Sequence, residues 1–420
     1  DVAPSRGLGD VYKRQLLDFL SKSPTAFHAV ENYRQILNAD GFKELLESEH
    51  WDIVPGGKYY VTRNNTSILA FKVGTKLDNY SFNIVTSHTD SPTFKVKENA
   101  EIEVKNKYTQ LNTEGYGGML CATWLDRPLS IAGRVLVSEG NSIVTKLLNI
   151  DRDLLMIPNV AIHMNRAAND GFKYNLQVDM LPLLSAGDDR QKDFKQIIAD
   201  ELGVKKEDIL GHDLYLYNRM APSIWGANEE FISAGHLDDL QCGFASLKAL
   251  LAGYNDESID IMACFDNEEV GSGTKQGADS TLLRDTLIRI NNALGKTEED
   301  YHRALASSFM LSADNAHAVH PNHPEHTDVT NCTYMNEGVV VKSHAGQKYT
   351  SDGVSMAVVK SLASGADVPL QYFANRSDKA GGSTLGNIAM AQASMNAVDI
   401  GLPQLAMHSS YETAGIKDTY

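Results

Sequence analysis

The chain has 420 residues, 42% of them hydrophobic, which is enough to bury a large core and predicts two domains. Its formal charge of −16 argues against nucleic acid and anionic membranes as partners. Four cysteines lie far apart without a C-x-x-C pair, which favours a reducing cytoplasm over a disulfide framework or a thiolate zinc site. No stretch approaches the length of a membrane span, and none near the start resembles a signal peptide.

The first part of the chain is predicted to begin a sheet with a helix on its flank. Residues 1–15 lack an initiating Met and resemble translated adapter sequence, so we set them apart as a non-native segment. A helix is predicted from Ser23 to Gly41, with Ser23 as N-cap, Pro24 in the first turn and Gly41 as the left-handed residue after its end. Residues 67–73 and 82–87 are rich in β-branched and aromatic side chains and are predicted strands.

From about Pro92 the pattern changes to alternating polar and apolar residues, as at 100–104 and 134–137. Before residue 230 one helix is predicted, over residues 193–202. Alternation of helices and strands resumes at Phe231. We therefore predict an α/β catalytic domain in two parts, residues 16–92 and 231–420, with an inserted, mainly β domain at residues 93–230.

Two adjacent glutamates, Glu268 and Glu269, directly follow the apolar run 259–265. Neighbouring carboxylates repel each other, so both stay charged only where a cation or a proton relieves the repulsion. A metal ligand beside a general base would meet that condition. On its own, however, an acidic loop after a strand is more often a solvated turn.

Other ligand-type residues stand where an apolar run stops. They are His88 after residues 82–87, Asp314 after residues 309–312, His408 after residues 402–407, and Asp238 before a predicted helix. Because ligands of open α/β sheets bind beyond the carboxyl ends of the strands, these side chains are predicted to converge. Such His, Asp and Glu ligands would suit a pair of zinc ions. Asp90, two residues after His88, can reach the ring nitrogen that His88 does not give to a metal.

Six motifs occur in order along the chain: SHTDSPTFKVK, GYGGMLCATWLDRPLSIAGRV, FISAGHLDDL, FDNEEVGS, LSADNAHAVHPN and PQLAMHS. With them, residues 16–420 resemble the aspartyl aminopeptidases, a family of di-zinc exopeptidases. The resemblance implies a mixed-sheet catalytic domain with an inserted oligomerisation domain, and a homo-oligomer, namely a dodecamer. It also implies removal of N-terminal Asp or Glu from peptides by a di-zinc-bound hydroxide, with cobalt or manganese able to replace zinc.

The resemblance assigns the metal ligands by motif position. One ion would be held by His88, Asp238 and Asp314, and the other by Asp238, Glu269 and His408. Glu268 takes the place of the general base, and Asp90 supports His88. Asp239 is expected to be a helix cap or a group supporting the ligands.

The resemblance also assigns residues that contact the substrate. Lys342 aligns with the lysine that pairs with the acidic side chain, and Tyr349, His317 and Gly382 align with substrate-contacting positions. His163 aligns with a catalytic histidine that reaches a neighbouring subunit's active site from the inserted domain. Without the family match, Lys342 would be a lysine leaving a strand for solvent and His163 an ordinary core or surface histidine.

Two alternatives remain open, apart from a metal-storage interpretation of a histidine run, which the prolines disfavour. Histidines recur every three residues from His317 to His326 and suggest metal storage, but Pro321 and Pro324 break any helix that would align the rings, so separate roles are predicted. The same di-zinc chemistry could serve an aminopeptidase of neutral specificity. The chain could also be an inactive peptide-binding or assembly scaffold, which the loss of a ligand would favour, and no ligand of the motif set is missing.

Overall fold

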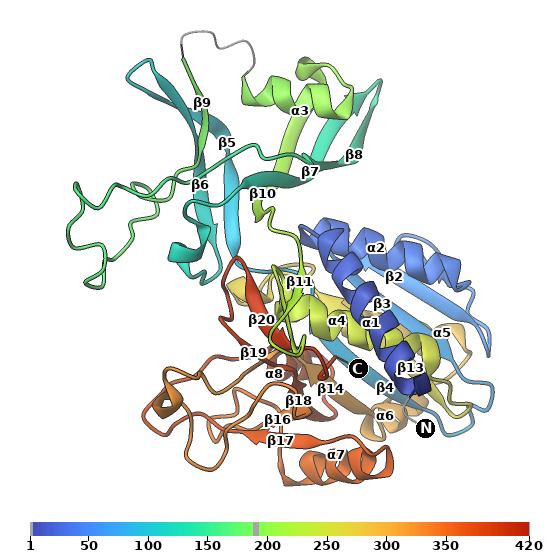
Figure 1. Ribbon diagram of the computed structural model, residues 1–420. Coiled ribbons are helices and arrows are strands. Elements are labelled where there is room, and N and C mark those ends of the chain that lie inside the picture. The colour runs from blue at the N-terminus through green and yellow to red at the C-terminus, as the bar shows by residue number, and fades with distance from the viewer. Residues whose placement is uncertain (1–2, 188–192, 420) are drawn as a thin grey trace. The chain divides into compact units, whose positions relative to one another are not determined.

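The computed structural model describes residues 3–187 and 193–419. They form two compact units (Figure 1): unit 1 comprises Asp1–Asp90, Pro222–Met407 and Glu412–Tyr420, and unit 2 comprises Ser91–Ala221 and His408–Tyr411. The α/β class with mixed sheets is confirmed. The predicted insertion at residues 93–230 extends beyond unit 2 at its end, because β11 (Ser223–Trp225) pairs with β12 (Phe231–Ala234) inside unit 1.

A nine-stranded sheet organises unit 1. Its order is β1 (Lys43–Glu44), β2 (Lys58–Arg63), β3 (Ser67–Val73), β13 (Ser258–Phe265), β4 (Ser81–His88), β14 (Phe309–Ala313), β18 (Asn396–Gly401), β16 (Val339–Lys342) and β17 (Leu370–Phe373). Strands β13, β4, β14 and β18 are parallel, whereas β3 and β16 pair antiparallel with their neighbours. All seven residues of β3 are buried, as expected for a strand covered on both faces.

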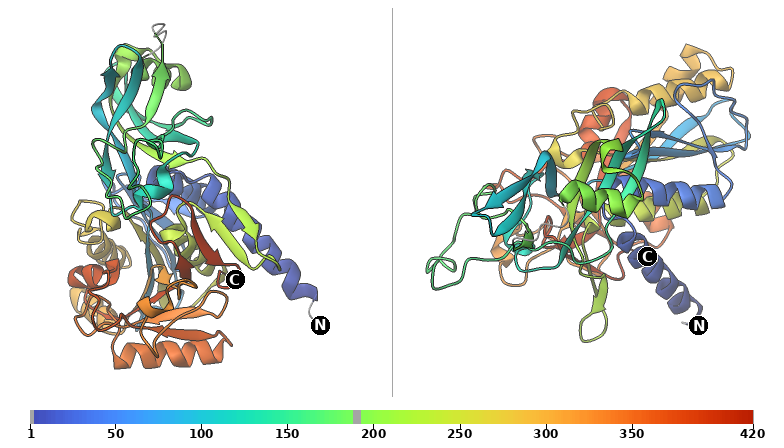
Figure 2. Two further views of the ribbon diagram at one scale, coloured as in Figure 1. Left: turned by 60° about the vertical axis from the view of Figure 1, so that its left-hand side comes forward. Right: turned by 90° about the horizontal axis from the view of Figure 1, so that it is seen from above.

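Helices cover both faces of this sheet (Figure 2, right). One hydrophobic core includes residues of α1 (Ala3–Ser21), α2 (Ala26–Ala39) and α4 (Leu237–Ala252). The other includes residues of α5 (Leu282–Ala293), α6 (Glu298–Ala306) and α8 (Leu385–Gln392). A further helix, α7 (Gly353–Gly365), contacts β18 near the end of the sheet. Within the described residues, no helix combines the length and the apolar character needed to cross a bilayer.

The predicted start of the first sheet-flanking helix is wrong by two residues. Helix α2 begins at Ala26, and Thr25 takes the extended N-cap conformation in place of Ser23. The hydroxyl of Ser23 instead donates to the carbonyl of Phe19 at 2.7 Å, so it satisfies the end of α1. Gly41 has φ +84° just after the helix, as predicted. Residues 3–15, part of the segment predicted to be non-native, form the first part of α1.

A smaller five-stranded sheet also belongs to unit 1. Its order is β11, β12, β20 (Glu412–Gly415), β19 (Pro403–Leu405) and β15 (Ala316–His317). Short 3₁₀ turns η3 (Glu268–Val270) and η4 (Pro324–His326) lie in the connections. This sheet brings the chain around His317, Gln404 and Glu412 side by side, although these residues are far apart in sequence.

Unit 2 is mainly β. Its antiparallel sheet has the order β8 (Ser142–Asn149), β7 (Leu129–Glu139), β10 (Ile209–Asn218), β5 (Thr93–Val104), β6 (Tyr108–Tyr116) and β9 (Leu183–Ala186). Helix α3 (Phe194–Leu202) begins after Asp193, whose side chain accepts from the amide of Gln196 at 2.8 Å, and ends at the left-handed Gly203. Two 3₁₀ turns, η1 (Cys121–Trp124) and η2 (Lys206–Asp208), complete the described elements.

Candidate metal centre

Three parallel strands of unit 1 end at the same edge of the large sheet. Strand β4 lies between β13 and β14, and His88 is paired with Phe265 in the ladder. His88 is the last residue of β4, Glu268 begins the turn after β13, and Asp314 directly follows β14. Asp238 reaches the same region from the first turn of α4. The structure thus brings together polar side chains from four separate segments.

His88 is oriented with one ring nitrogen directed at carboxylates. Its Nδ1 atom lies 3.0 Å from the carbonyl oxygen of Asp90. A carbonyl oxygen can only accept, so Nδ1 carries the proton and Nε2 keeps its lone pair in the neutral ring. The Nε2 atom lies 3.3 Å from Oδ1 of Asp238 and 3.9 Å from Oδ1 of Asp314.

These separations fit a shared metal ion. With zinc–ligand bonds of about 2.1 Å in a tetrahedral arrangement, two ligand atoms lie roughly 3.4 Å apart. The contact between His88 and Asp238 has this length, and Asp314 is slightly farther away. His88 thus faces carboxylates of both Asp238 and Asp314, and one imidazole with carboxylate oxygens is a set of donors that suits zinc.

Asp239 is more closely involved than its sequence position indicated. It is fully buried, and its Oδ2 atom accepts a hydrogen bond from the amide of His88 at 3.1 Å. It also forms a compact group of ligand-type atoms with His88 and Asp314. Its Oδ2 atom holds the His88 backbone, whereas Oδ1 of Asp238 faces Nε2 of His88. Asp238 as the ligand and Asp239 as its support remain predictions.

Asp90 fixes the turn that carries the two glutamates. Its two carboxylate oxygens accept from the amides of Glu268 and Glu269, each at 3.1 Å. These amides lie at the start of η3, where backbone N–H groups have no partner within the turn. The turn begins after Asn267, whose φ of +62° is left-handed. One carboxylate thereby links the backbone of this turn to the ring of His88.

Burial and mutual repulsion raise the pKa of several carboxylates of this site in the absence of a cation. Burial, with the charges of Asp314, Asp90 and Asp238, raises the pKa of Glu268 to about 8. Burial also raises the pKa of Asp314 to about 6, although Lys342 opposes the shift. For His88, burial would lower the pKa, but hydrogen bonds to Asp238 and Asp90 outweigh it and raise that pKa well above its usual value. A bound cation would relieve this repulsion.

Lys342 is placed close to the same carboxylates. It ends β16 and is only 3% exposed, and its Nζ atom donates to the carbonyl of Asn315 at 3.1 Å. Burial alone would lower its pKa, but the charges of Asp314, Tyr349 and Asp399 raise it, so the ammonium stays charged. The same Nζ atom lies 5.5 Å from the centroid of the Tyr349 ring. Lys342 therefore neutralises part of the negative charge next to Asp314.

A network of buried polar residues that the sequence did not predict supports this region. Asn315 donates from Nδ2 to Oε1 of Gln404 at 2.7 Å, and Gln404 donates to Oε1 of Glu412 at 3.3 Å. Glu412 in turn accepts from the amide of Asp238 at 2.9 Å. A buried Asp399 accepts from the Thr384 hydroxyl at 2.6 Å. The sequence signal was weak, namely single polar residues within apolar strands.

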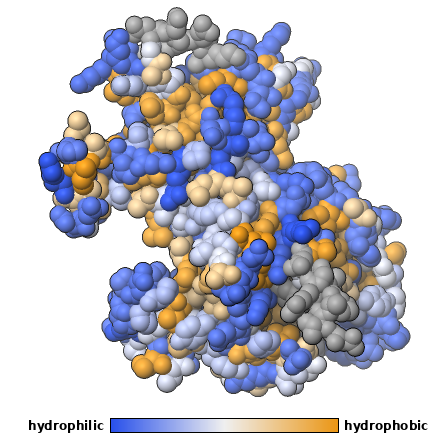
Figure 3. Space-filling model, viewed as in Figure 1, coloured by the Kyte–Doolittle hydropathy of each residue, from blue (hydrophilic) through white to orange (hydrophobic). Residues whose placement is uncertain are grey.

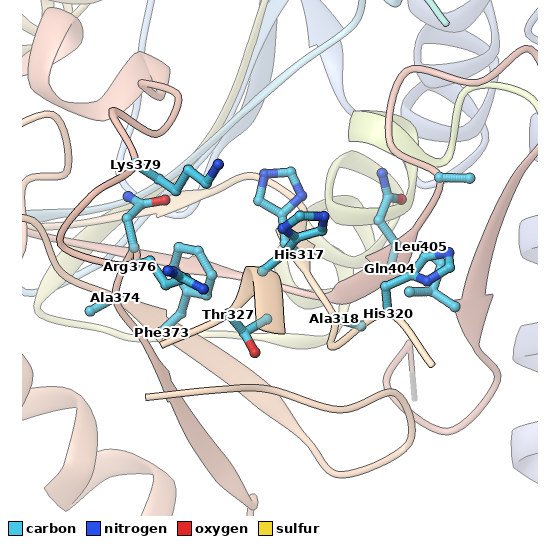
Figure 4. Close-up of a pocket in the computed structure, with 13 residues that line it drawn as sticks. His317, Ala318, His320, Thr327, Phe373, Ala374, Arg376, Lys379, Gln404 and Leu405 are labelled. Atoms are coloured by element: carbon cyan, nitrogen blue, oxygen red, sulfur yellow. The ribbon is translucent and has the colours of Figure 1, made fainter. Parts of the chain in front are cut away.

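A pocket of about 280 Å³ opens beside His317 (Figure 4). His317 lies on its wall, with its ring 6.1 Å from that of Phe373. Gly382 is exposed in the loop between β17 and α8 and is not among the residues lining this pocket. The histidines that follow His317 differ from the prediction. The rings of His320, His323 and His326 lie next to one another in tilted contacts, with centroids 5.5 and 5.2 Å apart, around the short turn η4.

Two predicted site residues belong to unit 2. His163 is exposed in the long connection between β8 and β9. His408 lies in the segment His408–Tyr411, and its Nδ1 atom is 3.0 Å from the carbonyl oxygen of Gly118. The carbonyl again requires the proton on Nδ1, so Nε2 is the nitrogen with metal-binding capacity. The roles of both histidines remain predictions.

Comparisons with known proteins agree with the chemistry of this donor set. Residues 19–420 match the family model for aminopeptidase I zinc metalloproteases, M18. The probable M18 family aminopeptidase 2 of Clostridium novyi is 48% identical over 415 residues, which are 97% of this chain and 96% of that protein. The counterpart in Stutzerimonas stutzeri is 40% identical, covering 97% and 95%.

Solved structures of aminopeptidases are also similar to this chain. A chain in the cryo-EM structure of the Ape4 and Nbr1 complex is 34% identical with a TM-score of 0.95, covering 99% of this chain and 85% of that one. The S. cerevisiae mApe1 dodecamer is 29% identical with a TM-score of 0.85, covering 98% and 94%. On these grounds, and with a buried imidazole–carboxylate cluster suited to zinc, the chain belongs to the M18 family of zinc metallo-aminopeptidases.

Proposed function

We propose that this M18 zinc aminopeptidase removes N-terminal Asp or Glu residues from peptides and holds two zinc ions per subunit. One ion would be bound by His88, Asp238 and Asp314, and the second by Asp238, Glu269 and His408. Cobalt or manganese could replace zinc at these oxygen and nitrogen ligands. The observation that carries the acidic specificity is the buried ammonium of Lys342 beside Asp314 and the Tyr349 ring.

Each residue has a part in the proposed hydrolysis. Zinc held by these residues would supply Lewis acidity for the scissile carbonyl and for water. Glu268 accepts a proton from the attacking water and returns it to the leaving amine. Its pKa, raised by burial to about 8 in the absence of metal, suits a group that both accepts and donates a proton near neutral pH. Asp90 holds the Glu268 backbone in place through its carboxylate.

Substrate recognition would require a positive group, because the chain carries a formal charge of −16. Lys342 would pair with the acidic side chain of the N-terminal residue, and Tyr349, His317 and Gly382 would contact the substrate. A desolvated lysine contributes more to such a pair than a surface lysine does. Lys342 is 3% exposed, which supports this role.

A homo-oligomer, namely a dodecamer, forms part of the proposal, with His163 of a neighbouring subunit stabilising the tetrahedral oxyanion. The connection that carries His163 has hydrophobic residues among hydrophilic ones on its surface (Figure 3). Its exposed apolar residues include Val160 (53%), Ile162 (46%), Met164 (84%) and Val178 (71%). Exposed apolar patches of this kind mark contact surfaces. The dodecameric S. cerevisiae relative also supports the proposal, and the four free cysteines support a cytoplasmic location.

Rates on aminoacyl p-nitroanilides bearing Asp, Glu, Leu and Lys test the specificity, with zinc content measured on the same sample. We expect kcat/KM for Asp or Glu to exceed that for Leu by at least about a hundredfold, or roughly 2.7 kcal/mol of transition-state binding. A Leu rate equal to or above the Asp rate would support neutral specificity instead. Absence of hydrolysis of all four by zinc-loaded protein would support the inactive scaffold.

A further inference from the structure

The pocket beside His317 collects basic side chains in an acidic protein. Its lining includes His317, His320, His326, Arg376 and Lys379. Among the described residues that line it, none is acidic. In Figure 4, Arg376 and Lys379 come from one wall, whereas His317 and His320 come from the other. We call this set of five residues the basic pocket.

The basic pocket shares a wall with the support of the metal centre. Gln404 lines the pocket and accepts from Asn315, the residue directly after Asp314. Through Glu412, the same Gln404 is connected to the amide of Asp238. Phe373, another residue of the pocket wall, belongs to the same apolar cluster as Tyr349. One hydrogen bond thus connects the pocket residue Gln404 to Asn315, which follows Asp314, and two connect it to the amide of Asp238.

The basic side chains of the pocket offer hydrogen-bond donors and positive charge to an anion. Arg376 is held by Asp378 at 2.8 and 2.9 Å and also donates to the carbonyl of Glu325, so its guanidinium is oriented but partly neutralised. Lys379 is exposed and, within the described part of the chain, has no ion-pair partner. The Nδ1 atom of His320 accepts from the amide of Asn322 at 3.2 Å, so a neutral ring carries its proton on Nε2 and offers a donor.

We propose that the basic pocket binds a second carboxylate of the peptide substrate, one located on the C-terminal side of the scissile bond. The inference rests on the proposed aminopeptidase function, in which Lys342 serves the N-terminal acidic side chain. The basic pocket uses different residues but lies against the same catalytic region, so it fits the adjoining part of a bound peptide. Arginine, lysine and histidine donors match a carboxylate. That carboxylate can come from an acidic side chain or from the C-terminus of a short peptide.

Two substrate pairs distinguish these sources. Asp-Glu-Ala-amide against Asp-Gln-Ala-amide isolates a side-chain carboxylate at nearly constant shape. Asp-Ala-Ala as free acid against its amide isolates the terminal carboxylate. In at least one pair we expect kcat/KM to favour the carboxylate by about tenfold, and Lys379→Met to remove most of that preference.

Lys360→Met is the matched control, because Lys360 is an exposed lysine of α7 in the same unit and lies outside the pocket. Lys360→Met and Lys379→Met remove the same charge. A general electrostatic attraction between the protein and acidic peptides would therefore weaken equally in these two variants. Equal preference in Lys379→Met and Lys360→Met, or no preference in the wild type for either pair, would overturn the proposal. The proposal would also be overturned if Lys379→Met changed only the preference for the N-terminal residue, measured as kcat/KM for Asp against Leu substrates with the same downstream sequence.

The same experiment separates this inference from the proposed function. Cleavage of Leu-Ala-Ala-amide in preference to Asp-Ala-Ala-amide would contradict acidic N-terminal specificity whatever happens in the two carboxylate pairs. Cleavage of Asp-Ala-Ala-amide without any downstream carboxylate preference would leave the proposed function intact and reject the basic pocket as a carboxylate site.

Discussion

The Nε2 atom of His88 lies 3.3 Å from Oδ1 of Asp238, and both side chains are almost completely buried. Two acceptors at this distance repel each other unless a proton or a metal ion lies between them. In the metal-free protein a proton takes this place, which is why the pKa of His88 is raised by Asp238 and Asp90 despite the opposing effect of burial. Metal binding and proton release are therefore coupled at this site.

Glu268→Gln and Glu269→Gln should have different consequences, although the two residues are adjacent. Glu268→Gln removes the proton acceptor, so the rate should fall by about two to four orders of magnitude with both metals retained. Glu269→Gln should reduce metal content, because a proposed ligand is lost. Elemental analysis and kcat on the same samples check this, with the exposed Glu257→Gln as control. Identical losses of metal and rate in both variants would reject the division of roles.

Lys342→Met should change specificity more than general activity. Removal of the ammonium should lower kcat/KM for Asp and Glu substrates by about a hundredfold or more, while slow Leu substrates lose far less. Lys72→Met is a matched control, because Lys72 is also buried and also donates to backbone carbonyls, those of Leu251 and Gly253, at 2.8 and 3.0 Å. Metal content must be measured in parallel, since Lys342 also lies near Asp314. An equal loss for acidic and neutral substrates would show that Lys342 does not set specificity.

His163→Ala should lower turnover without changing metal content or oligomer size. Since His163 is exposed on the apolar connection of unit 2, we expect it to serve a neighbouring subunit. Mixing His163→Ala with Glu268→Gln protein under conditions that exchange subunits should then restore part of the activity. Proven exchange without any recovery would mean that His163 acts within its own chain or has no catalytic part.

The stability of metal-free protein should fall as the pH rises from about 4.5 to 8. Burial raises the pKa of Glu268 to about 8, that of Asp266 to about 7 and that of Asp314 to about 6. Between their unfolded and folded pKa values these groups bind more protons in the folded state, so the free energy of unfolding decreases with pH, by up to about 1.4 kcal/mol per pH unit for each proton.

Zinc should reverse this trend, because it binds the deprotonated ligands. Thermal unfolding of chelated and zinc-loaded protein at pH 5, 6, 7 and 8 measures the difference in Tm. We expect the gap between the two forms to widen with pH. A constant gap across this range would contradict the account of the carboxylate cluster.

The ends of the central strands could be predicted from the sequence because the signal is local. The apolar runs before His88, Glu268 and Asp314 correspond to β4, β13 and β14, and parallel neighbours necessarily end at the same edge. The hydrogen bonds of Asp239, Gln404 and Glu412 could not be predicted in this way. Each of them joins segments that are 8 to 174 residues apart, so the partner is chosen by tertiary packing.

Competing local interactions explain the smaller errors. Ser23 was an acceptable N-cap by residue type, but its hydroxyl is used at the end of α1, and Thr25 takes the capping conformation. The tilted ring contacts of His320, His323 and His326 were not predicted, because the sequence analysis considered only a regular helix and not a short 3₁₀ turn such as η4.

A zinc titration of chelated protein, with bound metal and the rate on aspartyl p-nitroanilide measured on the same samples, tests the central claim most directly. That claim is that His88, Asp238 and Asp314 hold a metal ion required for hydrolysis. We predict that activity is lost on chelation, returns with zinc up to two ions per chain, and is not restored in His88→Ala, which binds less metal. Full activity in metal-free protein, confirmed by elemental analysis, would contradict the account.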